Sequence, residues 1–454
     1  MGGVRDVEKA SREELLEIIA AQQAQIDGLL ARVATLEEEV RRLRGGGSKD
    51  VPGWVKANRP KKEKHPRKRR QQSFVRRREE PDEIHEHAME RCPDCGRKLR
   101  GGWRHGSHQV IEILLPQVRI IEHRAMARWC GVCAKRWIPR LEGAQLGVQG
   151  RRRFGVSVQS TVAALHGAFR VPMKQIRRLL GELWGLRISD GEIVALLDGV
   201  AEAGSQEMAR LHDQVRGSPV VCVDETGWRQ GGQNGWLWTF STPQVRFFQY
   251  RKTRSGTVAE EVLGKEFKGR TVCDFYAGYN RLLNEIQRCW THLLRDLHAL
   301  KEKHADCAET IAWAETVKRV YEEAKAQAAR ATEVGLDCLQ RRRLREQSEA
   351  LLEALAQPVA KSSNAPHAVL AQRIMRHLGE LFVFVEHPHV PPDNNLAERS
   401  LRPAVTARKV SGGTRSQKGS ITKMALLSHF GTWTLQNRNL LTACRNLLLA
   451  TSPA

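Results

Sequence analysis

Two short apolar runs, each followed at once by an aspartate, constrain the fold more than any other feature of this chain. Residues 220–223 read as a buried strand that leads into Asp224 and a turn at 225–227. Residues 271–273 form a second β-prone run that leads into Asp274. If these strands are neighbours in one sheet, the two carboxylates meet and suit a hard divalent cation such as Mg²⁺. Taken singly, each aspartate is more simply explained as an ordinary turn residue.

A third carboxylate, Glu398, lies far downstream at the start of a predicted helix. The Asp/Asn cluster at 393–395 is suited to capping that helix, and Glu398 then falls in its first turn. Arg399 and Arg402 lie three residues apart on one side of the same helix. We expect Pro403 to kink or end the helix soon afterwards.

The residues around these acids predict the rest of a sheet and a helical insertion. Residues 236–240 and 245–250 read as two strands joined by a short turn, which makes a hairpin. The stretch between Asp274 and Glu398 is too long for a single connection in a compact sheet. Apolar spacing of three and four residues predicts helices within it, at 308–331, 339–356 and 367–381.

Three motifs contain the acids: Asp224-Glu-Thr-Gly-Trp, Asp274-Phe-Tyr-Ala-Gly-Tyr-Asn and Asp393-Asn-Asn-Leu-Ala-Glu398-Arg-Ser-Leu-Arg-Pro. Together they resemble the DDE transposases of the bacterial insertion sequence 66 family. The resemblance implies an RNase H-like mixed sheet with a helical insertion, in which Asp224, Asp274 and Glu398 are catalytic and bind Mg²⁺ or Mn²⁺. It also implies that water cuts DNA at the element's end, and that the freed 3′-hydroxyl then attacks target DNA without a covalent protein intermediate.

Charge and cysteine content indicate a polyanionic partner and a reducing compartment. The 454 residues, enough for about three domains, include 74 Lys and Arg against 51 Asp and Glu, a net charge of +23. Double-stranded DNA is the expected partner, and an anionic membrane surface is the alternative. Because we find no run of about 18 apolar residues and no leader pattern, we expect a cytoplasmic, nucleoid-associated protein. Its ten cysteines should then be thiols or metal ligands.

A seven-residue apolar repeat within residues 11–44 predicts a coiled coil. Ser11 and Glu14 have the spacing of a capping box at its start. One seam position holds Ile19, Ile26, Val33 and Val40, and the other holds Leu15, Leu29, Leu36 and Leu43, with Gln22 interrupting the leucines. Branched residues at one position and leucine at the other favour a parallel dimer, which would hold two element ends together. The alternative is an amphipathic helix that packs on its own chain.

A basic segment at 56–78 carries a charge of +11, nearly half of the total. Such a segment cannot bury a core, and it would contact phosphates without reading sequence. The alternative is a solvated linker. A second basic group follows Glu398. The residues that we expect to bind DNA are Lys61, Lys62, Lys64, Arg67, Lys68, Arg69, Arg70, Arg76, Arg77, Arg78, Arg399, Arg402, Arg408 and Lys409.

Two Cys-x-x-Cys motifs predict a zinc ribbon. They supply Cys92, Cys95, Cys130 and Cys133, and four thiolates from two such turns close a tetrahedral Zn²⁺ site. The intervening residues 110–121 read as β strand. A redox role fits less well because two motifs are present. The resemblance implies a zinc-binding domain at the same place.

Residues 173–184 and 192–200 read as two helices separated by Gly185, with Ser189 as the cap of the second. This pattern is typical of a helix-turn-helix, in which Arg177 and Arg178 would contact DNA, although helices of this length are also ordinary packing elements.

Several further groups have open roles. Cys289 and His292 resemble a pair found in insertion domains of this kind. They would bind a metal or, as we favour, pack beside the catalytic sheet. Glu225 and Asp393 are weaker candidates for the catalytic site, because a continuing strand would point Glu225 to the opposite face and because Asp393 has the position of a cap. Glu386 is a further alternative to Glu398 as third carboxylate.

The sequence therefore predicts a transposase with an α/β catalytic core and several DNA-binding parts. A catalytically silent DNA-binding regulator and an RNase H-like nuclease that cuts without joining are the alternatives. We expect a homodimer or higher oligomer, and the resemblance implies small accessory transposition proteins. The predicted parts are a coiled-coil helix (1–44), a basic linker (45–84), a zinc ribbon (85–140), a helix-turn-helix-like region (150–212), the core (213–280), a helical insertion (281–387), the remaining core with the Glu398 helix (388–420) and a helical tail (421–454).

Overall fold

The computed structural model describes residues 12–44, 80–102, 104–105, 108–111, 117–139, 147–148, 152–362 and 365–450. The chain divides into two compact units, Met1–Ile111 and Glu112–Ala454. Among the described residues, no helix is both long enough and apolar enough to cross a membrane.

The first unit contains one long helix, α1 (Arg12–Arg44), which agrees with the helix predicted for the heptad segment. Its apolar side chains have exposed fractions between 49% and 64% at Leu16, Ile19, Ile26, Leu29, Leu30, Val33 and Leu36. The helix therefore does not bury this stripe within the described chain, and its pairing with a second copy stays a prediction. The basic residues between Lys61 and Arg78 lie outside the described residues.

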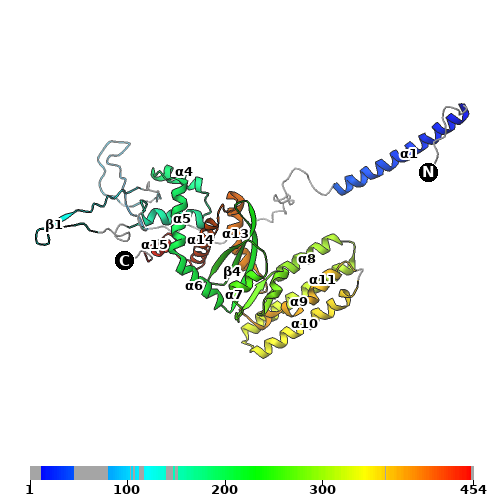
Figure 1. Cartoon of the computed structure of the whole chain (residues 1–454). Helices are drawn as coiled ribbons and strands as arrows, with labels where there is room; N and C mark the ends of the chain where they lie inside the picture. The colour runs from blue at the N-terminus through cyan, green and yellow to red at the C-terminus, as the bar shows by residue number, and fades with distance from the viewer. Residues whose placement is uncertain are drawn as a thin grey trace. The chain divides into compact units, whose positions relative to one another are not determined.

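The second unit holds the remaining named elements (Figure 1). Its strands are β1 (Arg128–Cys130), β2 (Lys135–Trp137), β3 (Val220–Gln230), β4 (Gln233–Ser241), β5 (Arg246–Arg251), β6 (Arg270–Cys273) and β7 (Ile286–Arg288). Its helices are α3 (Val156–Gly167), α4 (Met173–Trp184), α5 (Asp190–Ala203), α6 (Ser205–Arg216), α7 (Thr257–Leu263), α8 (Trp290–Lys303), α9 (Ala308–Glu333), α10 (Cys338–Ala360), α11 (Ala368–Arg376), α12 (Val383–Glu386), α13 (Asn395–Ser411), α14 (Gln417–Leu435) and α15 (Leu440–Ala450), with short 3₁₀ turns η2 (Ala277–Arg281) and η3 (Leu378–Glu380).

A five-stranded mixed sheet with the order β5-β4-β3-β6-β7 is the centre of this unit. Strands β3, β4 and β5 are antiparallel neighbours, so the predicted hairpin is confirmed, whereas β6 and β7 run parallel to β3. The prediction of a turn at 225–227 was wrong. Strand β3 continues to Gln230 because residues 225–230 pair with residues 233–238 of β4, and this ladder satisfies their backbone groups.

Helices cover both faces of the sheet. On one face, Val221 and Val223 of β3 pack with apolar residues of α6 and α7. On the other face, Cys222 packs in a cluster that includes residues of α8, α9 and α13. Because successive side chains of a strand point to opposite faces, Asp224 shares the face of Cys222, and Glu225 shares the face of Val223.

The predicted insertion is helical. The predicted helices 308–331 and 339–356 are confirmed as α9 and α10, whereas the one predicted at 367–381 is shorter, because α11 ends at Arg376 and a 3₁₀ turn, η3, follows. Helices α8 to α11 lie together beside the sheet (Figure 1, green to yellow). Their core contains Trp290, Trp313, Tyr321 and Leu352. The first part of the segment 281–387 is not insertion, because β7 pairs with β6 and belongs to the sheet. Three residues were too few to give a recognisable strand pattern.

The helix that carries Glu398 is longer than predicted. Pro403 lies inside α13, which continues to Ser411. A proline within a helix removes one hydrogen bond and costs about 3 kcal/mol or more. Burial of Leu401, Ala404 and Ala407 against the sheet side offsets this cost and holds the helix together past the proline.

The C-terminal helices are part of the core rather than a peripheral tail. Helix α14 lies along the edge strand β5, where the Ser428 and Thr432 hydroxyls accept hydrogen bonds from the backbone amides of Phe248 (2.9 Å) and Arg246 (3.0 Å). These bonds satisfy amides that an edge strand would otherwise leave unpaired. Helices α14 and α15 also share one hydrophobic cluster with α3, α4 and α5.

The two helices predicted as a helix-turn-helix are present as α4 and α5. Gly185 ends α4 in the left-handed conformation (φ 64°), which glycine adopts without a Cβ clash. Ser189 and Glu192 form a capping box at the start of α5. Arg177 and Arg178 contact Asp190 and Glu182, respectively, in surface ion pairs.

Candidate active site

The register of two neighbouring parallel strands places Asp224 beside Asp274. Val220 pairs with Arg270 and Cys222 pairs with Val272, so residues 220–222 of β3 each lie opposite the residue 50 positions later in the chain. The same offset sets Asp224 at the level of Asp274, the first residue after β6. Neighbouring strands lie about 4.8 Å apart, and we therefore place the two carboxylates side by side, at the level where β6 ends.

Helix α13 adds Glu398 to these two carboxylates. The side-chain amide of Asn394, the cap of α13, donates a hydrogen bond to the Val223 carbonyl oxygen (2.8 Å), directly before Asp224. Farther along the helix, the hydroxyls of Ser400 and Ser241 are joined by a hydrogen bond of 2.9 Å. These two contacts fix α13 across β3 and β4, with Glu398 in its first turn.

The pKa of Asp224 is strongly raised. Burial is the largest cause, and together with the negative charges of Glu225, Asp274 and Glu398, against a lowering by the Glu225 backbone amide, it raises the pKa of Asp224 to about 8. No positive side chain is among the causes of this shift. Carboxylate oxygens that repel one another in this way are the ligands that Mg²⁺ and Mn²⁺ prefer, so the residues present fit a hard divalent cation.

Glu225 lies on the opposite face of β3 and is occupied there. Its carboxylate accepts hydrogen bonds from the Tyr279 hydroxyl and from Arg254 Nε (2.7 Å). The Arg254 guanidinium also lies over the rings of Trp236 and Tyr276, at 4.8 and 4.0 Å from their centroids. Burial raises the pKa of Glu225, and its two partners lower it in part. Glu225 thus belongs to a buried network behind the site.

Asp274 is positioned by residues that sequence reasoning missed. The backbone amide of Tyr276 donates to Asp274 Oδ1 (2.9 Å), and the guanidinium of Arg288 donates to the Asp274 carbonyl oxygen (2.8 Å). Arg288 is on β7 and fully buried. Only its place in a three-residue strand makes it a support for Asp274, and no local sequence signal marks that strand.

The other candidate acids have structural partners. Asp393 Oδ1 accepts a hydrogen bond from the Asn395 backbone amide (3.0 Å), two residues later. The prediction that Asp393 is the cap was wrong, because α13 begins one residue later and its cap is Asn394. Glu386 is buried and forms ion pairs with Arg345 (2.9 Å) and Arg342 (3.6 Å). Glu386 therefore belongs to a separate charged network, and Glu398 is the acid that contributes to the charge at Asp224.

Comparison with known proteins identifies the chain that carries this site. The family model described as "Transposase IS66 family" matches residues 151–421. This chain belongs to the IS66 transposase family. The matched region includes the whole five-stranded sheet, the helical insertion and α13. A separate match of 58 residues, 40% identical, is to "Uncharacterized protein y4jO" of Sinorhizobium fredii, and it covers 13% of this chain and 18% of that protein.

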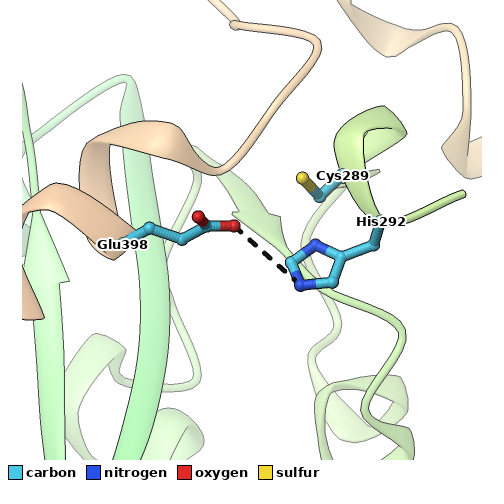
Figure 2. Close-up of side chains that lie close together, drawn as sticks. All are labelled: Cys289, His292 and Glu398. Carbon is cyan, nitrogen blue, oxygen red and sulfur yellow. Dashed lines mark ion pairs between the residues drawn. The ribbon is translucent and has the colours of Figure 1, made fainter. Parts of the chain in front are cut away.

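A cysteine and a histidine lie next to Glu398 in this IS66 family chain (Figure 2). His292 Nε2 is 3.9 Å from Glu398 Oε1, and one ligand atom each of Cys289, His292 and Glu398 lies within 4.8 Å of the other two. Cys289 is fully buried, and whether it packs or binds a metal stays open from the sequence. His292 is only partly buried, however, and its position beside the third acid could not be read from the sequence.

The two Cys-x-x-Cys motifs are each folded as tight turns. Cys92 accepts at its carbonyl oxygen from Gly96 (2.9 Å), and the Cys133 amide donates to Cys130 Sγ (3.4 Å). Backbone hydrogen bonds lower the pKa of Cys92 and Cys130. Cys92 and Cys95 belong to the first unit and Cys130 and Cys133 to the second, so the four-cysteine zinc site stays a prediction.

The strands around these cysteines differ from the prediction. Residues 110–111 and 117–121 are not in strands, and 112–116 lie outside the described residues. The strands next to the second motif are β1 and β2, which form an antiparallel pair. Residues 110–111 and 117–121 pair with no strand of the part of the chain that the structure describes, so the β-prone residue types there were not sufficient to give a strand.

The basic residues after Glu398 fall into two groups. Arg399, Arg402 and Lys409 are exposed on α13. Arg408 instead donates hydrogen bonds to the Gly227 carbonyl oxygen and to the Thr226 hydroxyl, and it links α13 to β3. Arg408 therefore has a structural task that the sequence did not indicate.

Proposed function

We propose that this protein is a DDE transposase of an insertion sequence, with Asp224, Asp274 and Glu398 as its catalytic acids. The single observation that supports the proposal is the register of β3 and β6, which aligns Asp224 with Asp274. After burial and the charge of Glu225, the charges of Asp274 and Glu398 are among the causes that raise the pKa of Asp224 to about 8. Divalent cations bound in the working state would compensate the repulsion between these carboxylates. The five-stranded mixed sheet is then the RNase H-like core of the enzyme.

The reaction is a displacement at phosphorus. Mg²⁺ or Mn²⁺ held by Asp224, Asp274 and Glu398 would supply Lewis-acid stabilisation of the attacking and leaving oxygens. Water attacks the phosphodiester at the element's end first, and the freed 3′-hydroxyl then attacks target DNA at the same site. The buried Glu225–Arg254–Tyr279 network holds β3 behind Asp224, while Asn394 holds α13 in front of it.

The remaining parts would bind and pair DNA ends. The exposed apolar stripe of α1 supports a dimer that holds two ends together. The basic segment at 56–78, the four cysteines with Zn²⁺ and the α4–α5 pair would add DNA affinity, together with Arg399, Arg402 and Lys409 beside the site. Most of this affinity would come from phosphate contacts and would fall steeply with salt.

The test is cleavage and joining of a labelled DNA end taken from the flanks of this gene, in the presence of Mg²⁺. We compare the parent with Glu398→Gln, and we use Glu302→Gln, an exposed glutamate of α8, as the matched control. Parent and control should cut and join, whereas Glu398→Gln should bind the end with unchanged affinity and do neither. Asp224→Asn and Asp274→Asn should behave as Glu398→Gln does.

Each other outcome selects an alternative. A parent that only binds the end is a DNA-binding regulator, and a parent that cuts without joining is a nuclease. If Glu398→Gln cuts as well as the parent, the third acid is wrong. Loss of binding in Glu398→Gln would instead mean that Glu398 has a structural role.

A further inference from the structure

The group beside the proposed catalytic acids contains donors that a magnesium site does not need. Cys289 and His292, at the start of α8, both project toward Glu398 of α13 (Figure 2). A thiol and an imidazole are poor ligands for Mg²⁺, but they are preferred by Zn²⁺ and similar transition metals. Glu398 thus has hard oxygen donors, the proposed catalytic aspartates, on one side and the softer donors of Cys289 and His292 on the other.

The distances suit a single small ion. Bonds of about 2.0 to 2.3 Å in a tetrahedral zinc site place its ligand atoms about 3.3 to 3.8 Å from one another. The pair formed by His292 Nε2 and Glu398 Oε1 is at 3.9 Å, and no pair of the three ligand atoms exceeds 4.8 Å. Small side-chain rotations would therefore bring the three atoms onto one ion.

Two of these side chains have buried polar atoms without a hydrogen bond. Glu398 Oε1 and His292 Nδ1 are both shielded from water and have no hydrogen-bond partner among the described residues. The distance of 3.9 Å between His292 Nε2 and Glu398 Oε1 is too long for a hydrogen bond. Leaving a buried polar atom unsatisfied costs about 1 to 3 kcal/mol. A cation bound to Glu398 Oε1 would recover this cost at Glu398, whereas a cation on His292 Nε2 leaves Nδ1 as it is.

The cysteine is held in place for such a role. Its sulfur accepts a hydrogen bond from the Asn394 backbone amide (3.1 Å), and its own amide donates to the Cys273 carbonyl oxygen (2.8 Å). Amide donors to a sulfur are the kind of outer contact that orients a thiolate ligand. The same Asn394 fixes α13 on β3, so the positions of Cys289 and Glu398 are coupled.

A second acid and histidine cluster contrasts with this one. Glu285, Glu386 and His387 also lie within metal-binding distance of one another. Arg345, however, donates to both glutamates, at 2.6 and 2.9 Å, and neutralises them. No such cation faces Cys289 or Glu398 in the contacts of the described residues.

We propose that Cys289, His292 and Glu398 form a binding site for Zn²⁺ that is distinct from the four-cysteine site. Binding releases the thiol proton of Cys289 and leaves a fourth ligand position to water. The consequence rests on the proposed function: Zn²⁺ bound to Glu398 Oε1 competes with the catalytic cation for this carboxylate. Zinc would then inhibit Mg²⁺-dependent cleavage.

The first experiment measures binding without DNA or activity. The full-length protein is titrated with Co²⁺, whose thiolate complexes give an intense charge-transfer absorption, and metal bound per chain is counted. We compare the parent with Cys289→Ser and His292→Gln, and with Cys338→Ser, an exposed cysteine, as control. Cys92→Ser removes the signal of the four-cysteine site in each background.

We expect the parent and Cys338→Ser to show a thiolate absorption in addition to that of the four-cysteine site. Both proteins should also bind one additional Co²⁺ per chain compared with Cys289→Ser. His292→Gln keeps the Cys289 thiol and should raise the dissociation constant of the additional ion by more than about tenfold. Because His292 is partly exposed, this variant tests the site even if Cys289→Ser fails to fold, which circular dichroism reports. Identical spectra and stoichiometry in all four proteins would overturn the proposal.

The second experiment measures inhibition. Cleavage of the DNA end at fixed Mg²⁺ is titrated with Zn²⁺, and each variant is compared with its own zinc-free rate. The inhibitory concentration should rise more than about tenfold in His292→Gln and stay unchanged in Cys338→Ser. Equal inhibition of both would overturn the competition at Glu398. A parent that cleaves nothing overturns the proposed function, while the cobalt titration still decides the site.

Discussion

Replacing Asp224 by asparagine should stabilise the metal-free protein while removing its activity. Burial first, and then the charges of Glu225, Asp274 and Glu398, raise the pKa of Asp224 from 3.8 to about 8. Between these values the folded protein keeps the proton that the unfolded chain has lost. The free energy of unfolding therefore falls as the pH rises from about 4 to about 8, and it levels off above that.

The size of the effect follows from the same two values. Each pH unit within this window contributes about 1.36 kcal/mol, so Asp224 lowers the stability of the metal-free fold by up to about 4 kcal/mol at pH 7. Asparagine keeps an oxygen for the Glu225 amide, which donates to Asp224 at 2.8 Å, but carries no charge. We expect Asp224→Asn to be more stable by about 1 to 4 kcal/mol at pH 7.

Urea unfolding between pH 5 and pH 8.5 in a chelating buffer measures this difference, followed by the fluorescence of buried tryptophans such as Trp238 and Trp290. Asp213→Asn, at an exposed position of α6, is the control and should keep the parent's pH slope. Mg²⁺ at a hundred times its dissociation constant should add about 2.7 kcal/mol to the parent and far less to Asp224→Asn. An Asp224→Asn protein with the parent's slope, or with lower stability at pH 7, would refute the reasoning.

Three further predictions concern other parts of the chain. A Cβ at Gly256 would lie 1.9 Å from the Gly278 carbonyl oxygen, so Gly256→Ala should lower the unfolding free energy by about 2 kcal/mol or more. Gly181→Ala, on an open helix face, should raise the unfolding free energy by up to about 1 kcal/mol. Equal denaturation midpoints of the two variants would contradict this prediction. Glu386→Gln should destabilise the protein by about 1 to 3 kcal/mol in the same urea assay, because Arg345 keeps its positive charge but loses the negative charge of its partner at 2.9 Å. The variant should keep DNA cleavage, and loss of cleavage at full stability would make Glu386 a catalytic acid. Lysine in place of both Ile26 and Val33 should convert a dimer to a monomer in light scattering, and an unchanged mass would show that this stripe is not the dimer seam.

Local patterns were sufficient to predict most elements near the site. The apolar runs before Asp224 and Asp274 are strands, and Glu398 is in the first turn of its helix, because strand alternation and helix capping depend on neighbouring residues. Local patterns failed to predict where an element ends when a partner distant in the sequence determines its length. Strand β3 continues past Asp224 because β4 supplies the hydrogen bonds, and α13 continues past Pro403 because its sheet-facing side is buried.

The sequence by itself determined the charge, most of the helices and the strands that precede Asp224 and Asp274, since these follow from residue types and short spacings. Only the tertiary structure decided which face of β3 each acid occupies and which side chains meet Glu398. Asn394 reaches Val223 across 171 residues and Cys289 across 105, and such contacts depend on how the strands and helices pair. Pairing is set by burial of whole faces, which no short pattern contains, so the position of His292 beside Glu398 emerged only from the fold.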